Sequence, residues 1–211
     1  MRKLAASGSW GPMVHLIGTD HFRAQRKMRG LDPTEIQRHY QSVVESAIQS
    51  IHPDLLAEED HPSYLSGDGA ESLLLPIAQS HGIRHLFVEA DRATQTKLGY
   101  KTVDVIKELL IARGEPSAIA ASAHKIAHQF PIRERFWLGE IGKTGAGKVL
   151  LVFGDLHLTT LTGLLASEGI PYSIFAERVG VDIANDPEYE ALQYAKECSM
   201  FGNTDCFCLK N

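Results

Sequence analysis

Short apolar segments alternate along this chain with segments of helical periodicity, and this alternation restricts the fold more than any other feature. Helical patterns lie between most of the apolar segments. An alternation of this kind indicates an α/β layered fold with a mostly parallel central sheet of about five or more strands, flanked by helices. The segments rich in β-branched or aromatic residues that predict strands are Met13–Ile17, Asp54–Ala57, His85–Val88, Val149–Phe153 and Tyr172–Phe175.

The clearest helical pattern begins at Asp32, which we predict as its N-cap, with Glu35 at the capping-box position, and it keeps one face apolar as far as Ile51. A second helix is predicted from Ala70 to His81, where Pro76 marks a kink or a late start. Further helices are predicted over residues 102–113, 117–129, 134–141, 158–167 and 188–200.

The bulk composition predicts a single α/β domain over residues 1–211. Of the 211 residues, 44% are hydrophobic and 22% are charged, and a domain of this length buries enough apolar surface to fold without a metal or disulfides. The net charge of −5 gives no positive field for nucleic acid or anionic lipid, so we expect neither as a partner. No segment reaches the ~18 apolar residues of a membrane span and no hydrophobic signal core follows the N-terminus, so we expect a cytoplasmic protein that does not associate with membranes.

The cysteines Cys198, Cys206 and Cys208 lie together in a C-terminal tail over residues 198–211. An odd number of cysteines confined to a tail does not predict a disulfide framework. The tail could bind a soft metal ion, but its cysteine spacing matches no standard zinc pattern. We therefore expect free thiols there rather than a metal site.

Ionisable side chains follow the predicted strands. The first strand runs into His21 and the fourth into His157, while Glu58 and Glu59 follow the second strand and Glu89 follows the third. Because the carboxyl ends of parallel strands share the sheet edge at which α/β proteins bind ligands, these side chains should lie close together. Any one of them could be a solvated loop residue, but buried carboxylates and imidazoles are costly unless paired or metal-bound, so their convergence favours a functional site.

Both histidines belong to the same short motif, Gly-x-x-His, formed by Gly18 with His21 and by Gly154 with His157. A glycine has no Cβ, so we expect the chain to turn sharply off the strand there and to bring the imidazole back over the sheet edge. An imidazole can ligate a metal or act as a base near neutral pH, and a glutamate beside it can ligate a hard metal, activate water or fix the tautomer. Activation of water is the chemistry that these roles share.

Two further motifs are better explained without a ligand. The segment Gly142–Lys148 has the Gly-x-x-x-x-Gly-Lys spacing of a phosphate-binding loop, but Val149 replaces the Ser or Thr, and the strand follows the loop instead of preceding it. His124 and His128 have the i, i+4 spacing of two metal ligands, but Lys125 stands where a zinc protease has glutamate. We expect a glycine-rich turn in the first segment and two partly exposed helix histidines in the second.

The order of these motifs resembles that of the TraB/Tiki superfamily, which includes erythromycin-esterase-like and ChaN-like proteins. The resemblance covers roughly residues 13–176, and an arginine before the fourth strand, Arg133 or Arg135 in "PIRERFWLGEI", is similar to the arginine of the family's helix. This chain departs from the family by its compact length and by the aspartates Asp20 and Asp155 inside the two motifs. The other residues that carry the resemblance are Gly18, His21, Glu58 or Glu59, Glu89, Gly154 and His157.

The resemblance implies a hydrolase of peptide or ester bonds that acts on a small-molecule or peptide substrate. Tiki proteins are thought of as metal-dependent proteases, and erythromycin esterases as enzymes in which a histidine activates water. In the metal-dependent version a divalent ion binds the water that attacks the substrate, and a set of mixed oxygen and nitrogen donors suits Mn, Co or Zn. The expected ligands of that ion are His21, Glu59, Glu89 and His157.

Two alternatives to this metal-dependent version stay open. In a metal-free hydrolase, His21 is the base, one of the strand-end glutamates orients it, and Arg133 or Arg135 stabilises the developing oxyanion. In a non-catalytic protein of ChaN-like type, the same polar edge binds haem, iron or another small ligand. The ChaN-like resemblance also leaves room for a homodimer.

Overall fold

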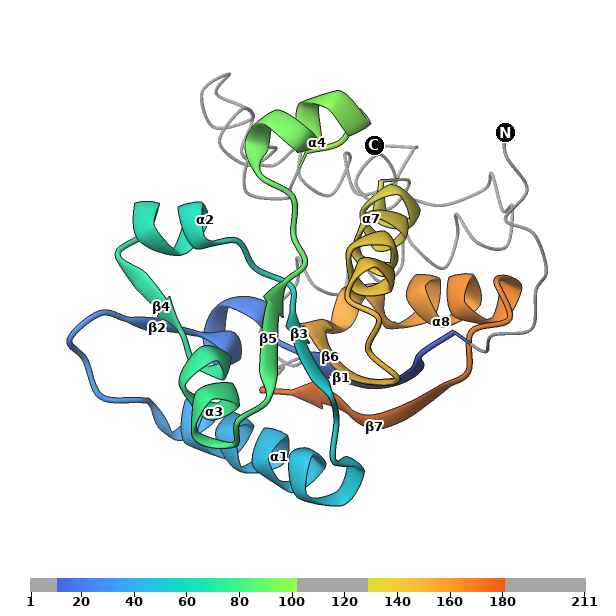
Figure 1. The fold of residues 1–211 in the computed structure, drawn as a ribbon. Helices are drawn as coiled ribbons and strands as arrows, with labels where there is room; N and C mark the ends of the chain where they lie inside the picture. Colours follow the sequence, from blue (N-terminus) through green and yellow to red (C-terminus); the bar gives the residue numbers. More distant parts are fainter. Residues whose placement is uncertain (1–10, 102–128, 181–211) are drawn as a thin grey trace, which may run out of the picture.

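The chain folds into three layers, with a central sheet between two layers of helices (Figure 1). The computed structural model describes residues 11–101 and 129–180, apart from the side chains of His21 and Phe22. The strands of the central sheet are β1 (Met13–Thr19), β3 (Leu55–Glu58), β5 (Arg84–Phe87), β6 (Lys148–Gly154) and β7 (Tyr172–Val179). All five are parallel, in the order β5-β3-β6-β1-β7, which confirms the predicted α/β layered fold.

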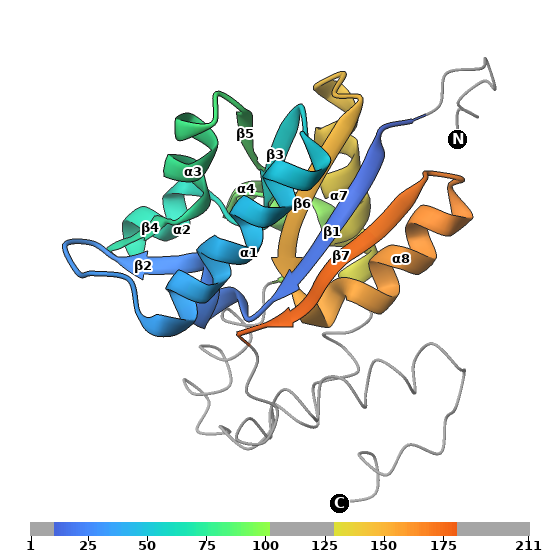
Figure 2. The ribbon, with the colours of Figure 1, turned by 90° about the horizontal axis from the view of Figure 1, so that it is seen from below.

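Helices cover both faces of this sheet. α1 (Glu35–Ile51) and α3 (Leu74–Ser80) pack on one face, and α7 (Phe130–Lys143) and α8 (Leu158–Ser167) pack on the other (Figures 1 and 2). Side chains of β6 alternate between the two hydrophobic cores, so residues 149–153 are all buried. A strand that is buried on both faces reads as an unbroken apolar run, which is why β6 was so clear in the sequence.

Short elements follow the carboxyl ends of the strands. A π-helical turn over His21–Gln25 follows β1, α2 (Pro62–Gly67) follows β3, α4 (Arg92–Leu98) follows β5, and a 3-10 turn over Asp155–His157 follows β6. A separate two-stranded antiparallel sheet consists of β2 (Arg26–Met28) and β4 (Ala70–Ser72).

The chain changes direction across the sheet at the neighbouring strands β1 and β6. From β1 it passes through α1 toward β3 on one face, whereas from β6 it passes through α8 to β7 on the other face. Such a divergence marks the sheet edge at which α/β proteins bind ligands. The two Gly-x-x-His motifs lie at the exits of these two strands, where Thr19 is the register partner of Gly154.

Gly18 lies inside β1, and close packing rather than the expected sharp turn explains why this position is glycine. A Cβ on Gly18 would lie 2.4 Å from Asp155 Oδ1. The same oxygen accepts a hydrogen bond from the backbone N–H of Arg178 at 2.9 Å, and Arg178 has a left-handed φ of 57°. Asp155 therefore ties together the ends of β1, β6 and β7.

Two helices start at residues other than those predicted. The helix predicted from Ala70 begins at Leu74, because residues 70–72 form β4 and pair with β2. The helix predicted from Glu134 begins earlier, at Phe130, with a proline in its first turn. A local helical pattern was overridden in the first case by pairing with a strand distant in sequence.

The N-cap of α1 is Thr34, and the prediction of Asp32 with Glu35 in the capping box is wrong. The Thr34 hydroxyl accepts from Gln37 N at 3.2 Å, and the Gln37 side chain accepts from Thr34 N at 2.8 Å. Gln37 Nε2 also donates to Arg26 O at 2.6 Å, so tertiary structure favours this cap over the earlier one.

Several predictions fall on residues that are not described: the helices over 102–113 and 188–200, nearly all of the helix over 117–129, and the cysteine tail. Within the described ranges, no helix is long and apolar enough to cross a membrane.

We predict that Gly18→Ala destabilises the fold by about 1–3 kcal/mol, because the new methyl group overlaps the Asp155 carboxylate inside a packed strand. The measurement is the free energy of unfolding in urea. Gly163→Ala is the matched control, because Gly163 is exposed in α8 with no atom within 4 Å of a new Cβ, and alanine is the better helix former. Equal stability of the Gly18→Ala variant and the wild type would contradict the packing explanation.

Candidate active site

Four ionisable side chains meet at the carboxyl edge of the sheet, around Arg133 of α7. The guanidinium Nη2 of Arg133 donates to Glu59 Oε1 at 2.5 Å and to Glu89 Oε2 at 2.6 Å. Nη1 of the same group lies 3.0 Å from His157 Nε2. Glu59 follows β3, Glu89 follows β5 and His157 follows β6, so three strand exits and one helix supply the cluster.

This cluster is almost entirely removed from solvent. The exposed fraction is 6% for Arg133, 5% for Glu59, 6% for Glu89 and 3% for His157. Isolated charges at such depth cost several kcal/mol each in real proteins, so mutual pairing is the condition for keeping them there. One guanidinium faces two carboxyl groups, so the two carboxyl groups are not equally compensated and their pKa values differ.

The two carboxyl groups have their pKa values shifted in opposite directions. Burial raises the pKa of Glu59, and the neighbouring charge of Glu89 adds to this, against the opposing effects of Arg133 and of the Gly154 N–H. Burial also acts to raise the pKa of Glu89, but Arg133 and the hydroxyl of Tyr100 together lower it below its ordinary value of 4.5. Glu89 is therefore the lasting anionic partner of Arg133, and Glu59 is the group that takes up a proton more readily.

Hydrogen bonds from several elements hold the Glu89 carboxylate. Tyr100 Oη donates to Oε1 at 2.6 Å, Gln95 Nε2 of α4 donates to the same oxygen at 3.3 Å, and Trp137 Nε1 of α7 donates to Oε2 at 3.3 Å. The guanidinium carbon of Arg133 also lies 5.3 Å from the centre of the Trp137 ring, within the range of a cation–π contact. This carboxylate is saturated with donors, which fits its lowered pKa.

His157 contacts two aromatic rings and has a protein group at each ring nitrogen. Its ring centre lies 4.1 Å from that of Phe130 and 4.7 Å from that of Trp137. Nδ1 lies 2.9 Å from Glu134 Oε1, while Nε2 faces Arg133 and lies 3.6 Å from Glu59 Oε1. The imidazole therefore has one fixed orientation within the cluster.

The two strand-end glutamates of β3 point to opposite faces of the sheet, so only Glu59 reaches Arg133. Glu58 is fully buried on the side of α1 and α3, where its Oε2 accepts from Ser72 Oγ at 2.6 Å and lies 2.9 Å from His85 Nε2. His85 of β5 thus pairs with Glu58. Alternation along the strand separates the two carboxylates.

The two arginines of α7 are separated in the same way. Arg133 is buried in the cluster, whereas Arg135 pairs at 2.8 Å with Glu168 and keeps 62% of its side chain exposed. His21 opens the π-helical turn that follows β1, and its side chain is not among those described. The structure therefore brings Glu59, Glu89, Arg133 and His157 together and places Glu58 and Arg135 elsewhere.

The described donors do not fit a metal ion as they stand. Among the described residues, no group of three or more histidines, cysteines or acidic side chains could hold one. Glu59 and Glu89 are directed at the Arg133 guanidinium, and both ring nitrogens of His157 face a protein group. Within this part of the chain, Arg133 lies between the side chains that the metal-dependent version would use as ligands of a divalent ion.

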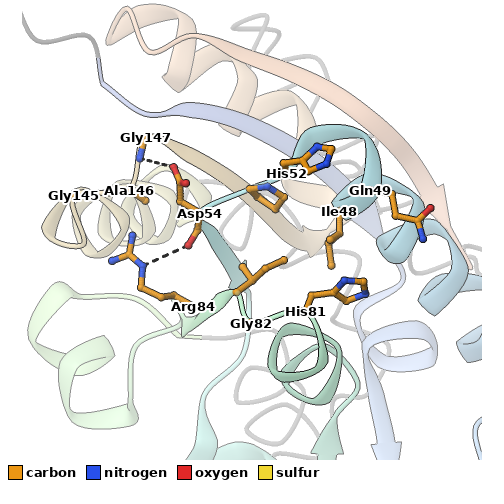
Figure 3. A pocket seen from close by; sticks show the side chains of 12 residues that line it. Ile48, Gln49, His52, Asp54, His81, Gly82, Arg84, Gly145, Ala146 and Gly147 are labelled. Carbon is orange, nitrogen blue, oxygen red and sulfur yellow. Dashed lines mark hydrogen bonds between the residues drawn. The ribbon is translucent and has the colours of Figure 1, made fainter.

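The Gly142–Lys148 segment lies at the opposite edge of the sheet, beside a cavity of about 680 Å³ (Figure 3). The carboxylate of Asp54 accepts from the backbone N–H groups of Gly147 at 3.1 Å and of Lys148 at 2.8 Å. The ammonium group of Lys148 donates to Ile51 O at 2.7 Å. The segment is thus the end of α7 and a glycine-containing turn over residues 144–147 that leads into β6, so only its middle forms the predicted turn. The cavity lies away from the Arg133 cluster.

Glu134, Tyr100 and Trp137 belong to the site, but the sequence analysis did not select them. A signal was present for one helix: its buried positions recur at the spacing of a single helical face, and two of them are charged. Charged residues on a buried face require partners, and this reasoning selects Arg133 over Arg135. The buried positions of α7 are Phe130, Arg133, Glu134, Trp137 and Ile141.

No known protein family, curated protein or solved structure matches the chain.

We predict that Arg133→Ala lowers the free energy of unfolding by about 3–5 kcal/mol, because it leaves two buried carboxyl groups without their cation. Arg135→Ala should stay close to the wild type, since exposed ion pairs contribute little. Urea unfolding of the two variants side by side measures the difference. Equal effects of the two substitutions would mean that Arg133 does not compensate the buried carboxylates.

We predict that the stability lost in Glu89→Gln depends on pH. A carboxyl group whose folded pKa is lowered stabilises the fold at pH values above its ordinary 4.5, and this contribution disappears as the pH falls through the folded value. The gap between the wild type and Glu89→Gln should therefore be full at pH 7 and should close on acidification below pH 4.5. Unfolding curves over this range, with Glu168→Gln as the exposed control, measure it; a gap that stays constant with pH contradicts the assignment.

Proposed function

We propose that the chain is a hydrolase of ester or peptide bonds that acts on a small-molecule or peptide substrate. Its reacting groups are Arg133, Glu59 and His157, and His21 at the neighbouring strand exit is proposed to complete the site. The TraB/Tiki resemblance indicates the same class of reaction from motif order alone. The arrangement around Arg133 supports a metal-free version of that reaction, but with His157 as the base in place of His21.

The observation that carries this proposal is the opposite perturbation of two carboxyl groups around one guanidinium. Burial raises the pKa of Glu59, whereas Glu89, although buried, has its pKa lowered beside Arg133. Environments that push two pKa values apart suit one group to proton transfer and the other to a lasting charge. Glu59 is accordingly the proton carrier, and Glu89 keeps Arg133 in place.

In the proposed reaction, the carbonyl oxygen of the substrate replaces His157 Nε2 as the acceptor of Arg133 Nη1. Water adds to the carbonyl carbon, one of its protons moves to the freed Nε2, and the carbonyl electron pair moves to the oxygen beside Arg133. As the tetrahedral intermediate collapses, the imidazolium gives its proton to Glu59, whose Oε1 lies 3.6 Å from Nε2 in the resting site. Glu59 passes this proton to the leaving alcohol or amine and returns to its starting state.

A bound Mn, Co or Zn ion stays a prediction of the sequence, as does the binding of haem or iron in a non-catalytic protein. Elemental analysis of the wild type and of a His21→Ala/His157→Ala double variant, purified without chelator, tests the metal directly. Near-stoichiometric metal that is lost in the double variant would favour the metal-dependent version over the metal-free one.

The test of the proposed function is hydrolysis of chromogenic esters and peptides by the purified chain. Arg133→Lys keeps the charge but loses the forked donor geometry, so we expect kcat to fall at least about 100-fold. Arg135→Lys is the matched control on the same helix and should retain activity. A wild type that turns over no substrate, while haem raises its melting temperature, would instead support the ligand-binding alternative.

A further inference from the structure

Two consecutive residues of α7, Arg133 and Glu134, contact the two ring nitrogens of His157. Arg133 Nη1 lies 3.0 Å from His157 Nε2, and Glu134 Oε1 lies 2.9 Å from Nδ1. His157 itself follows β6, so a helix on one side of the site and a strand exit on the other form this contact. The imidazole is therefore clamped between a cation and a carboxyl group of the same helix.

The chemistry of the two partners assigns the tautomer of this imidazole. A guanidinium can only donate, so His157 Nε2 must be the acceptor and carries no proton in the resting site. The ring proton then sits on Nδ1 and is donated to Glu134 Oε1. Nε2 keeps its lone pair on the side of Arg133 and Glu59.

The carboxyl group of Glu134 is more deeply buried than the two side chains beside it in the cluster. The side chain of Glu134 is fully buried, whereas those of His157 and Arg133 retain 4% and 8% exposure. The hydroxyl of Thr160 also donates to Glu134 Oε1, the oxygen that faces His157 Nδ1. Glu134 therefore reaches the proposed reacting groups by its contact with His157.

We propose that Glu134 is the positioning residue of the site. It holds His157 in the Nδ1–H tautomer, so that Nε2 is unprotonated and can accept a proton from water once the substrate takes over Arg133 Nη1, and it stabilises the imidazolium that this transfer creates. The second part of this role rests on the proposed hydrolase, whereas the first part concerns the resting protein alone. Nothing in the role requires Glu134 to become protonated.

The resting tautomer can be read directly from the wild type. In protein labelled with ¹⁵N at histidine, long-range ¹H–¹⁵N spectra distinguish the two neutral tautomers, and His157→Asn identifies the signals of this ring. We expect a protonated Nδ1 with a strongly downfield, slowly exchanging proton. A ring that carries its proton on Nε2 overturns the proposal without any variant or substrate.

Glu134→Gln tests the carboxylate itself, because it keeps the shape of the side chain and removes the charge. The Nδ1 proton should move upfield and exchange faster, and kcat should fall at least tenfold with little change in KM. Glu140→Gln, on the same helix but paired near the surface with Lys143, is the control and should leave both unchanged. An unaltered Nδ1 signal in a folded Glu134→Gln variant refutes the positioning role.

The two proposals fail separately. If the wild type gives the expected spectra but hydrolyses no substrate, the assigned tautomer is supported and the proposed hydrolase is contradicted. If Glu134→Gln hydrolyses substrate as fast as the wild type, the proposed hydrolase is supported and the positioning role of Glu134 is contradicted. If Glu134→Gln does not fold, Thr160→Val, which removes the hydroxyl that contacts Glu134 Oε1 and the backbone carbonyl of His157, should shift the same Nδ1 proton.

Discussion

The structure depends on the contact between Arg133 and the two buried carboxyl groups of Glu59 and Glu89. Each charge would be costly alone, and together they are retained only while α7 stays packed over the exits of β3 and β5. The same contact determines the chemistry, because one cation cannot neutralise two carboxylates equally. The contact with Arg133 is therefore needed to keep the two carboxyl groups buried, and it also gives Glu59 and Glu89 different roles.

The sheet and its polar edge could be predicted because each strand is a short apolar run followed by an ionisable residue. The choice between Glu58 and Glu59 could not be made, since both faces of β3 are buried and alternation has no solvent side to indicate direction. The choice between Arg133 and Arg135 could have been made from the helical face that Arg133 shares with Trp137. The residues that contact this face of α7 come from distant segments of the chain, so the local sequence pattern does not identify them.

Other differences between the predicted and the observed structure arise where the local sequence fits two interpretations and a contact with a distant residue selects one of them. Asp32 and Thr34 are both good N-caps, and the bond from Gln37 to Arg26 selects the second. Gly18 was explained by the freedom of its backbone, but its significance lies in the atoms of Asp155 above it. A glycine in a strand can indicate that another part of the chain packs closely against it, but the sequence alone does not identify that part.

The central position of β6 has a consequence for how the molecule is made. β6 lies between β1 and β3, so these two earlier strands have no direct pairing and become one sheet only when the later strand inserts between them. During synthesis Glu59 and Glu89 emerge before the helix that carries Arg133. The two glutamates are therefore synthesised before their cation, and both the closure of the sheet and the neutralisation of these carboxyl groups require the same later segment, from α7 to β6.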